Sequence, residues 1–100
     1  MNRFSPLELM FSSKCSVRIM AALLEREELN VSELVRLTGM SHKSVIESAE
    51  KLSALGVIKE KRFGRIRIYQ LEKNKEVVVL VFKLNEELSK LWTGSRRQST

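Results

Sequence analysis

The side chains that usually perform catalysis or bind metals are scarce in this sequence. Its 100 residues include one cysteine, Cys15, one histidine, His42, and no aspartate. A structural zinc site needs four Cys or His ligands, and a catalytic triad would have to use the only histidine without any aspartate beside it. The glycines are scattered and form no phosphate-binding loop. These residue types argue against an enzyme and predict neither a bound metal nor a cofactor.

Positive charge is the chemistry that this sequence concentrates in one place. The formal net charge is +6 at pH 7. Residues 1–55 and residues 72–93 balance their basic and acidic side chains, whereas residues 56–71 carry a single glutamate against Lys59, Lys61, Arg62, Arg65 and Arg67. A focused basic patch is typical of phosphate binding and favours double-stranded DNA as the partner. A surface that only aids solubility is the alternative interpretation.

Three helices are predicted before this basic segment. A serine, Ser13 or Ser16, can cap a helix that runs to about Arg26, and Ser32 can cap a shorter helix over residues 33–37. Ser41 can cap a third helix to about residue 54 or 55, and residues 38–40 form a glycine-containing turn before it. Ser5 and Pro6 also favour a short helical turn over residues 6–11. Residues 30–31 are too short to be more than a bridge.

The basic segment itself is predicted to be a β-hairpin. Residues 57–62 and residues 66–71 read as two strands around Gly64. The second strand alternates imperfectly between two sets of residues, Ile66, Ile68 and Gln70 against Arg65, Arg67, Tyr69 and Leu71.

The last predicted element is a helix over residues 73–93. Its apolar residues follow a coiled-coil-like spacing, and we call these positions the seam: Val77, Val81, Leu84, Leu88 and Leu91. A domain this small has little core left for such a strip to cover, so we expect it to pair with a second copy in a homodimer. The alternative is that the helix packs back on its own domain.

The order helix, helix, turn, helix, hairpin, helix is the layout of a winged helix-turn-helix, a mainly α fold with a small β-hairpin and the order α-α-α-β-β-α. About two-thirds of the chain also resembles the ArsR-like winged-helix regulators, especially the small archaeal ones. The resemblance rests on residues 11–14, 30–34, 38–41, 55–58 and 64–69, together with Val45 and Leu52.

The resemblance implies that the helix after Ser41 enters the DNA major groove. Its first residues, Ser41, His42, Lys43 and Ser44, would reach bases or phosphates. Ile46 would meet a thymine methyl group and Glu47 a cytosine amino group, although Ile46 can equally pack at the core and Glu47 can pair with Lys43 or Lys51. Family members usually carry more basic residues on this helix, which is neutral here.

The resemblance also implies that the hairpin is a wing on the DNA backbone. Lys59, Lys61, Arg62, Arg65 and Arg67 would contact phosphates, and Arg65 is the best candidate to enter a minor groove. An edge strand guarded by charges is the alternative interpretation. The metal-sensing Cys and His clusters of some family members have no counterpart, because Cys15 stands alone and is expected to be a buried small hydrophobe, with a cross-subunit disulfide as the alternative.

The whole sequence therefore predicts a dimeric transcriptional repressor that occludes DNA. We expect a DNA-binding domain over residues 1–72, a dimerisation helix over residues 73–93 and a disordered tail over residues 94–100. A non-specific architectural DNA-binding protein and a winged-helix protein-interaction module are the alternatives. No apolar run approaches the length of a membrane span and no export signal is recognisable, so a cytoplasmic location without a membrane partner is expected.

Overall fold

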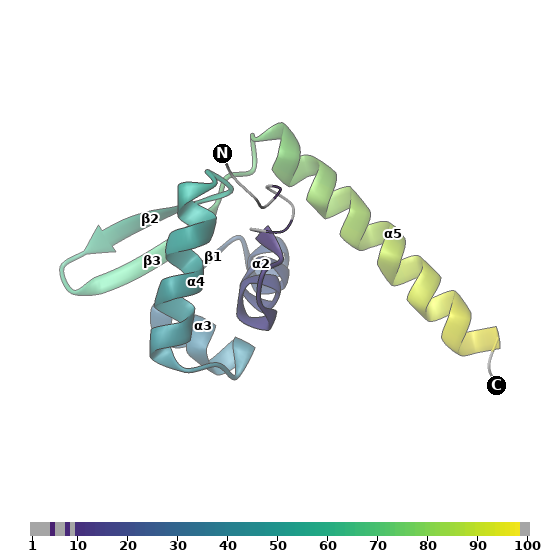
Figure 1. The fold of residues 1–100 in the computed structure, drawn as a ribbon, viewed down its shortest axis with the longest axis horizontal. Coiled ribbons are helices and arrows are strands. Elements are labelled where there is room, and N and C mark those ends of the chain that lie inside the picture. The colour runs from purple at the N-terminus through teal and green to yellow at the C-terminus, as the bar shows by residue number, and fades with distance from the viewer. Residues whose placement is uncertain (1–4, 6–7, 9, 99–100) are drawn as a thin grey trace.

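A computed structural model describes residues 5, 8 and 10–98, with side chains described up to residue 93. The elements are α2 (Lys14–Arg26), β1 (Glu28–Asn30), α3 (Val31–Thr38), α4 (His42–Ala54), β2 (Ile58–Phe63), β3 (Ile66–Leu71) and α5 (Glu76–Gln98). Figure 1 shows α2, α3 and α4 packed together, with the β2–β3 hairpin projecting on one side and α5 on the other. The fold is mainly helical with a small antiparallel sheet, as the sequence predicted.

Side-chain caps set where α2 and α4 begin, and both agree with the sequence. Ser13 accepts a hydrogen bond from the Ser16 N–H at 3.1 Å, and Ser41 accepts one from the Ser44 N–H at 3.1 Å. Each cap pairs one of the N–H groups that lack partners in the first helical turn. Of the expected helical turn over residues 6–11, residues 6, 7 and 9 lie outside the described residues. Glu8 and Met10 are helical, and Ser5 and Glu8 exchange two capping hydrogen bonds.

Helix α3 begins earlier than the sequence predicted, because its cap is Asn30 and not Ser32. The Asn30 side chain accepts from the Glu33 N–H at 2.8 Å, and Glu33 accepts from the Asn30 N–H at 2.9 Å. This reciprocal arrangement is a capping box, which pairs two N–H groups where Ser32 would pair one. The start of α3 is therefore fixed directly at the end of β1.

The turn between α3 and α4 is held by its backbone and by α2. Gly39 ends α3 with φ of 70°, a left-handed conformation that only glycine adopts without strain. The Arg18 guanidinium donates to the Thr38 carbonyl at 2.6 Å, which fastens the end of α3 to α2. The turn thus sets the angle at which α4 leaves α3.

The sheet has three strands in the order β1-β3-β2, one more than the sequence predicted. Strand β1 is antiparallel to β3, with Leu29 opposite Tyr69. The sequence predicted no more than a bridge at residues 30–31, whereas Asn30 ends β1 and Val31 begins α3. The strand conformation of β1 comes from its pairing with β3 and the burial of Leu29, and not from its own short sequence. The hairpin is confirmed, with Phe63 opposite Ile66 as the last pair before the turn.

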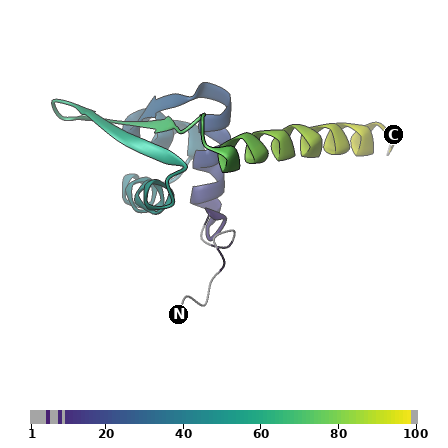
Figure 2. The ribbon, with the colours of Figure 1, turned by 90° about the horizontal axis from the view of Figure 1, so that it is seen from above.

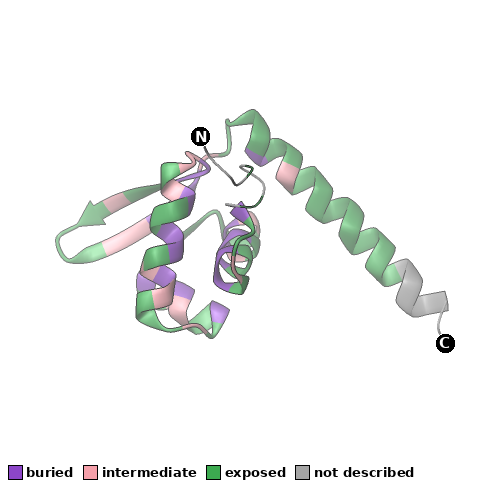
Figure 3. Ribbon diagram, viewed as in Figure 1, coloured by how far each residue is buried: buried purple, intermediate pink, exposed green. Residues whose placement is uncertain are grey.

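The core lies between the three packed helices and the base of the sheet. Ile19, Leu23, Leu34, Val45, Leu52 and Tyr69 are all completely buried. Figure 3 shows the buried residues on the inner faces of α2, α3 and α4, whereas most of the hairpin tip and of α5 is exposed. In β3 the buried face is the one with Tyr69 and Leu71, and Ile66 on the other face is 53% exposed.

Helix α5 leaves the body of the molecule soon after it begins, as the view in Figure 2 makes clear. Val78 is buried and Val81 half-buried, and from residue 82 to residue 93 every residue is exposed. The helix extends to Gln98, five residues past the predicted end, since no proline interrupts it and one glycine costs a helix only about 1 kcal/mol. The disordered tail predicted for residues 94–100 stays a prediction, and residues 99–100 lie outside the described residues. Within the described residues, no helix combines the length and apolar character needed to cross a membrane.

Candidate nucleic-acid interface

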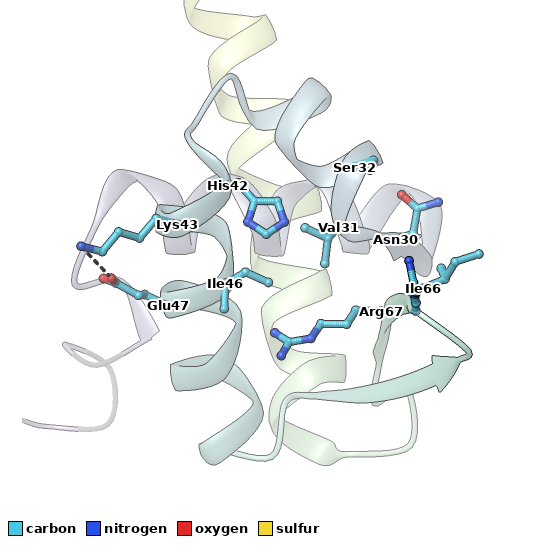
Figure 4. A pocket seen from close by; sticks show the side chains of 10 residues that line it. Asn30, Val31, Ser32, His42, Lys43, Ile46, Glu47, Ile66 and Arg67 are labelled. Carbon is cyan, nitrogen blue, oxygen red and sulfur yellow. Dashed lines mark ion pairs between the residues drawn. The ribbon is translucent and has the colours of Figure 1, made fainter.

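An open hollow on the surface joins α4 to the β2–β3 hairpin, which we call the wing. Residues from three places line it: the start of α3, the first turns of α4, and the distal part of β3 with its turn. Figure 4 shows His42 and Ile46 projecting from α4, with the Arg67 guanidinium extending toward them from the wing. The hollow is lined by Asn30, Val31, Ser32, His42, Lys43, Ile46, Glu47, Arg65, Ile66 and Arg67.

The first turn of α4 presents the positive end of the helix dipole beside this hollow. His42 and Lys43 are exposed there, whereas Ser44 is half-buried. The Ser41 hydroxyl accepts from the Ser44 N–H and lies 3.0 Å from the Ser44 hydroxyl, so both serines are engaged in capping. Such a helix start favours anions, because its backbone N–H groups and dipole point outward.

One turn further along α4, the two residues considered for base contact have internal partners. Glu47 lies 3.9 Å from Lys43, and the side chains are 60% and 86% exposed. An ion pair this exposed contributes little stability, so a ligand can displace it at little cost. Ile46 is half-buried against the core cluster and still borders the hollow. The geometry therefore allows both the packing roles and the contact roles of these residues.

The five basic residues of the wing divide into two groups by their partners. Lys61 pairs with Glu28 at 3.0 Å, Arg62 with Glu60 at 2.9 Å, and Lys59 with Glu72 at 3.7 Å. Arg65 and Arg67 form no salt bridge with any residue that the structure describes, and both line the hollow. The two wing arginines without a salt-bridge partner among the described residues thus lie where the wing faces α4, although Arg67 also interacts electrostatically with Glu60.

A buried tyrosine braces the base of the wing. Tyr69 is completely buried, and its hydroxyl donates to a Glu60 carboxylate oxygen at 3.0 Å. Burial and the Glu60 carboxylate raise the pKa of Tyr69. Arg62 donates to the other carboxylate oxygen, and this hydrogen bond is the largest cause that holds the pKa of Glu60 below its usual value. The brace ties both strands of the wing to the core.

The structure brings together some of the predicted DNA-binding residues and separates others. His42, Lys43, Glu47, Arg65 and Arg67 share the hollow. Lys59 lines a different depression at the base of the hairpin, with residues 70–75.

Two features of this region were not identified from the sequence. The start of α3 belongs to the hollow, because the capping box at Asn30 brings it beside the wing. The Glu60–Tyr69 brace was also missed. The hairpin register could have revealed this interaction, because it places Glu60 and Tyr69 directly opposite one another.

The seam predicted on α5 is largely uncovered in the single chain. Leu84, Leu88 and Leu91 are 50%, 53% and 69% exposed, and Val77 is 42% exposed. Val81 is half-buried against the core cluster, where it helps to line an apolar groove between α2 and α5. This groove is lined by Phe11, Val17, Met20, Ala21, Leu24, Val81, Leu84, Asn85 and Leu88.

The single cysteine lies inside the core. Cys15 is 3% exposed and has a free thiol. Within the described part of the chain, no group of three or more His, Cys, Asp or Glu residues is arranged to hold a metal ion.

Comparison with known proteins gives matches in structure but not in sequence. No protein-family model matches the sequence, and no curated protein does either. HlyU from Vibrio cholerae is 22% identical, with a TM-score of 0.69 over 82% of this chain and 85% of that one. AntR, described as an antimony-specific transcriptional repressor, is 18% identical, with a TM-score of 0.73 over 88% and 77% of the two chains. A protein described as an ArsR family transcriptional regulator is 25% identical, with a TM-score of 0.60 over 89% and 98%.

These likenesses agree with the element order, the capped helix pair and the hairpin described above. They extend over most of both chains in each case. The chain has the winged helix-turn-helix fold, and through that fold it resembles the ArsR-like regulators, as the sequence indicated.

Proposed function

We propose that this protein is a DNA-binding transcriptional regulator that acts as a homodimeric repressor in the cytoplasm. The observation that carries the proposal is the hollow in which the exposed start of α4 faces two arginines without salt bridges, Arg65 and Arg67. Proteins of the same fold are described as transcriptional repressors and regulators, which supports the same kind of activity here.

In this proposal α4 enters the major groove. The positive helix start, together with His42 and Lys43, meets phosphates or base edges. Glu47 then exchanges Lys43 for a cytosine amino group, and Ile46 contacts a thymine methyl group. The Ser41 and Ser44 hydroxyls fix the first turn of α4, and their contribution to binding is to hold the neighbouring residues in place.

The wing supplies most of the attraction to the phosphate backbone. Arg67 extends over the hollow toward α4 (Figure 4). Arg65 occupies the turn between β2 and β3, from which it enters the minor groove. Lys59, Lys61 and Arg62 contribute less to this attraction, because each is partly neutralised by a glutamate.

The homodimer forms through the seam of α5. A projecting helix with three half-exposed leucines leaves apolar surface in water, and pairing with a second copy buries it. The groove between α2 and α5 is continuous with the seam through Val81, Leu84 and Leu88. A two-fold axis would present two α4 helices to half-sites about 34–36 Å apart.

Non-specific architectural DNA binding is the second candidate, and the neutral charge of α4 favours it. Selection of bound duplexes from a random DNA pool at near-physiological salt tests both candidates. The regulator predicts enrichment of a palindromic sequence. Binding without enrichment would support the architectural candidate, and absence of binding would leave a protein partner as the explanation for the basic wing.

A further inference from the structure

The tip of the wing carries two large apolar side chains in water. Phe63 is 62% exposed and Ile66 is 53% exposed. They are directly opposite each other on β2 and β3, and the two-residue turn Gly64–Arg65 joins them. Cross-strand neighbours of this kind project from the same face of a hairpin. Natural edge strands usually carry charges in such places to prevent sticking, so an apolar pair here indicates a contact surface.

Neither side chain belongs to the core of the described chain. Strand β1 pairs with β3 only at residues 68–70, so the distal part of the hairpin has no third strand beside it. Figure 1 shows this part of the wing extending away from the helices. Packing against the residues that the structure describes therefore does not account for Phe63 and Ile66.

The charges around the pair indicate what it contacts. Arg62 and Arg67 form the adjacent cross-strand pair, and Arg65 lies in the turn. Like charges directly opposite each other destabilise a hairpin. One carboxylate, Glu60, forms a salt bridge with Arg62 and also interacts electrostatically with Arg67, so a single negative charge is shared between two arginines. Such an arrangement is stabilised when a polyanion supplies the missing negative charge. Because Arg65 and Ile66 also line the hollow beside α4, the tip is continuous with the proposed DNA surface.

We propose that Phe63 and Ile66 form an apolar wedge that follows Arg65 into the DNA minor groove, opens a base step and bends the duplex. This inference rests on the proposed DNA binding and adds to it a way of reading sequence. Apolar side chains inserted between base steps kink DNA toward the major groove. Pyrimidine–purine steps such as TA open most easily, so the wedge selects deformable sites without hydrogen bonds to bases.

The wedge is tested with the full chain and the double variant Phe63→Thr/Ile66→Thr. Threonine is β-branched and keeps the strands, while it removes the apolar reach of the tip. Leu37→Ala is the control, since Leu37 is 45% exposed on α3 and lines a depression away from the wing. Circular dichroism and thermal melting establish that each variant is folded.

The probes are two duplexes of equal composition, one with a central TA step and one without, each with fluorophores at its ends. For the wild type and Leu37→Ala, energy transfer should rise on the TA duplex, with about tenfold tighter binding to it. The double variant should bind both duplexes equally, with no rise in energy transfer.

Three results would overturn the wedge, and they are distinguishable. Equal bending by the wild type and the double variant would refute the wedge but leave the proposal of DNA binding standing. Failure of the wild type to bind either duplex would remove the proposed function as well. A change in oligomeric state of the double variant, with bending retained, would assign the apolar tip to contact with a second copy.

Discussion

Helix α4 and the wing border the same hollow, but they carry their charge in different ways. On α4, the exposed Lys43 and Glu47 pair with each other and the helix is neutral overall. On the wing, Arg65 and Arg67 have no salt-bridge partner in the described chain and face α4. The difference separates two tasks, because unpaired positive charge attracts any phosphate backbone whereas neutral contacts discriminate between bases.

The two elements also differ in how firmly the core holds them. Val45, Ala49 and Leu52 anchor α4 along its length, each with no exposed surface. The wing is anchored only at its base, through Tyr69, Leu71 and Ile58, and its tip is exposed. A rigid helix suits the exact placement of side chains against base edges, while a hairpin held at one end can follow the backbone of many sequences.

The largest expected loss of DNA affinity comes from separating the two copies of the proposed dimer, since each copy would present one α4 and one wing to the DNA. We expect Leu84→Glu/Leu88→Glu to convert the proposed dimer to monomers in sedimentation experiments, because the seam would carry like charges. Affinity for a duplex with two half-sites should fall about 100-fold, since the second contact is no longer intramolecular. Lys83→Glu changes the net charge by the same two units outside the seam and should leave the dimer intact. Persistent dimers in the double variant would exclude the seam as the interface.

The next effect tests the wing side of the comparison. Arg65→Ala/Arg67→Ala should weaken binding to all sequences by roughly tenfold or more, and should lower the slope of log affinity against log salt by about 2. Arg26→Ala/Arg36→Ala removes the same charge from exposed positions outside the hollow and should change the slope little. An unchanged slope in the wing variant would mean that these arginines do not contact phosphates.

Substitutions on α4 should change the discrimination between DNA sequences, whereas those on the wing should change the affinity for all sequences. His42→Ala or Glu47→Ala is expected to reduce discrimination between a selected site and a random duplex by about tenfold, with the affinity for the random duplex kept. Competition binding with both duplexes measures this ratio, and Glu50→Ala, an exposed position of α4 outside the hollow, is the matched control. Identical discrimination in the wild type and both variants would show that α4 does not read bases through these residues.

Much of this fold could be predicted from the sequence because its boundaries are local. Ser13 and Ser41 cap helices within one turn, and Gly39 and Gly64 take the positive φ angles that their turns need. The features that were missed depend on distant partners. Strand β1 forms because β3 lies beside it. Asn30, and not Ser32, caps α3 because the Asn30 and Glu33 side chains each accept a hydrogen bond from the other residue's backbone N–H.

The candidate site was less predictable than the fold for the same reason. The position of the positive charge was visible in the sequence, but which basic residues have a salt-bridge partner depends on glutamates from other elements, such as Glu28 on β1 and Glu72 after β3. The brace at the wing base likewise joins residues nine positions apart. Sequence spacing alone does not determine such pairs until the hairpin register is known.

A smaller effect tests the anchor of the wing. Tyr69→Phe keeps the buried ring and removes the hydrogen bond to Glu60, so it should lower the free energy of unfolding by about 1 kcal/mol. Urea denaturation measures this change, and DNA affinity should stay close to that of the wild type because Arg65 and Arg67 both keep their charge. A large loss of affinity with unchanged stability would mean that the hydroxyl positions the wing arginines directly.

The smallest effect is a pH dependence of stability at the same anchor. The pKa of Glu60 lies below its usual value of 4.5, chiefly because Arg62 donates to its carboxylate. Folding therefore favours the ionised form, so this stabilisation is complete above pH 4.5 and is lost as the pH falls through the lower pKa of the folded state. Glu60→Gln cannot ionise, and its unfolding midpoint in urea should fall less than that of the wild type over this acidic range. Equal acid sensitivity would mean that the Glu60–Arg62 pair adds nothing to the anchor, and that the buried Tyr69 ring alone fixes the wing beside α4.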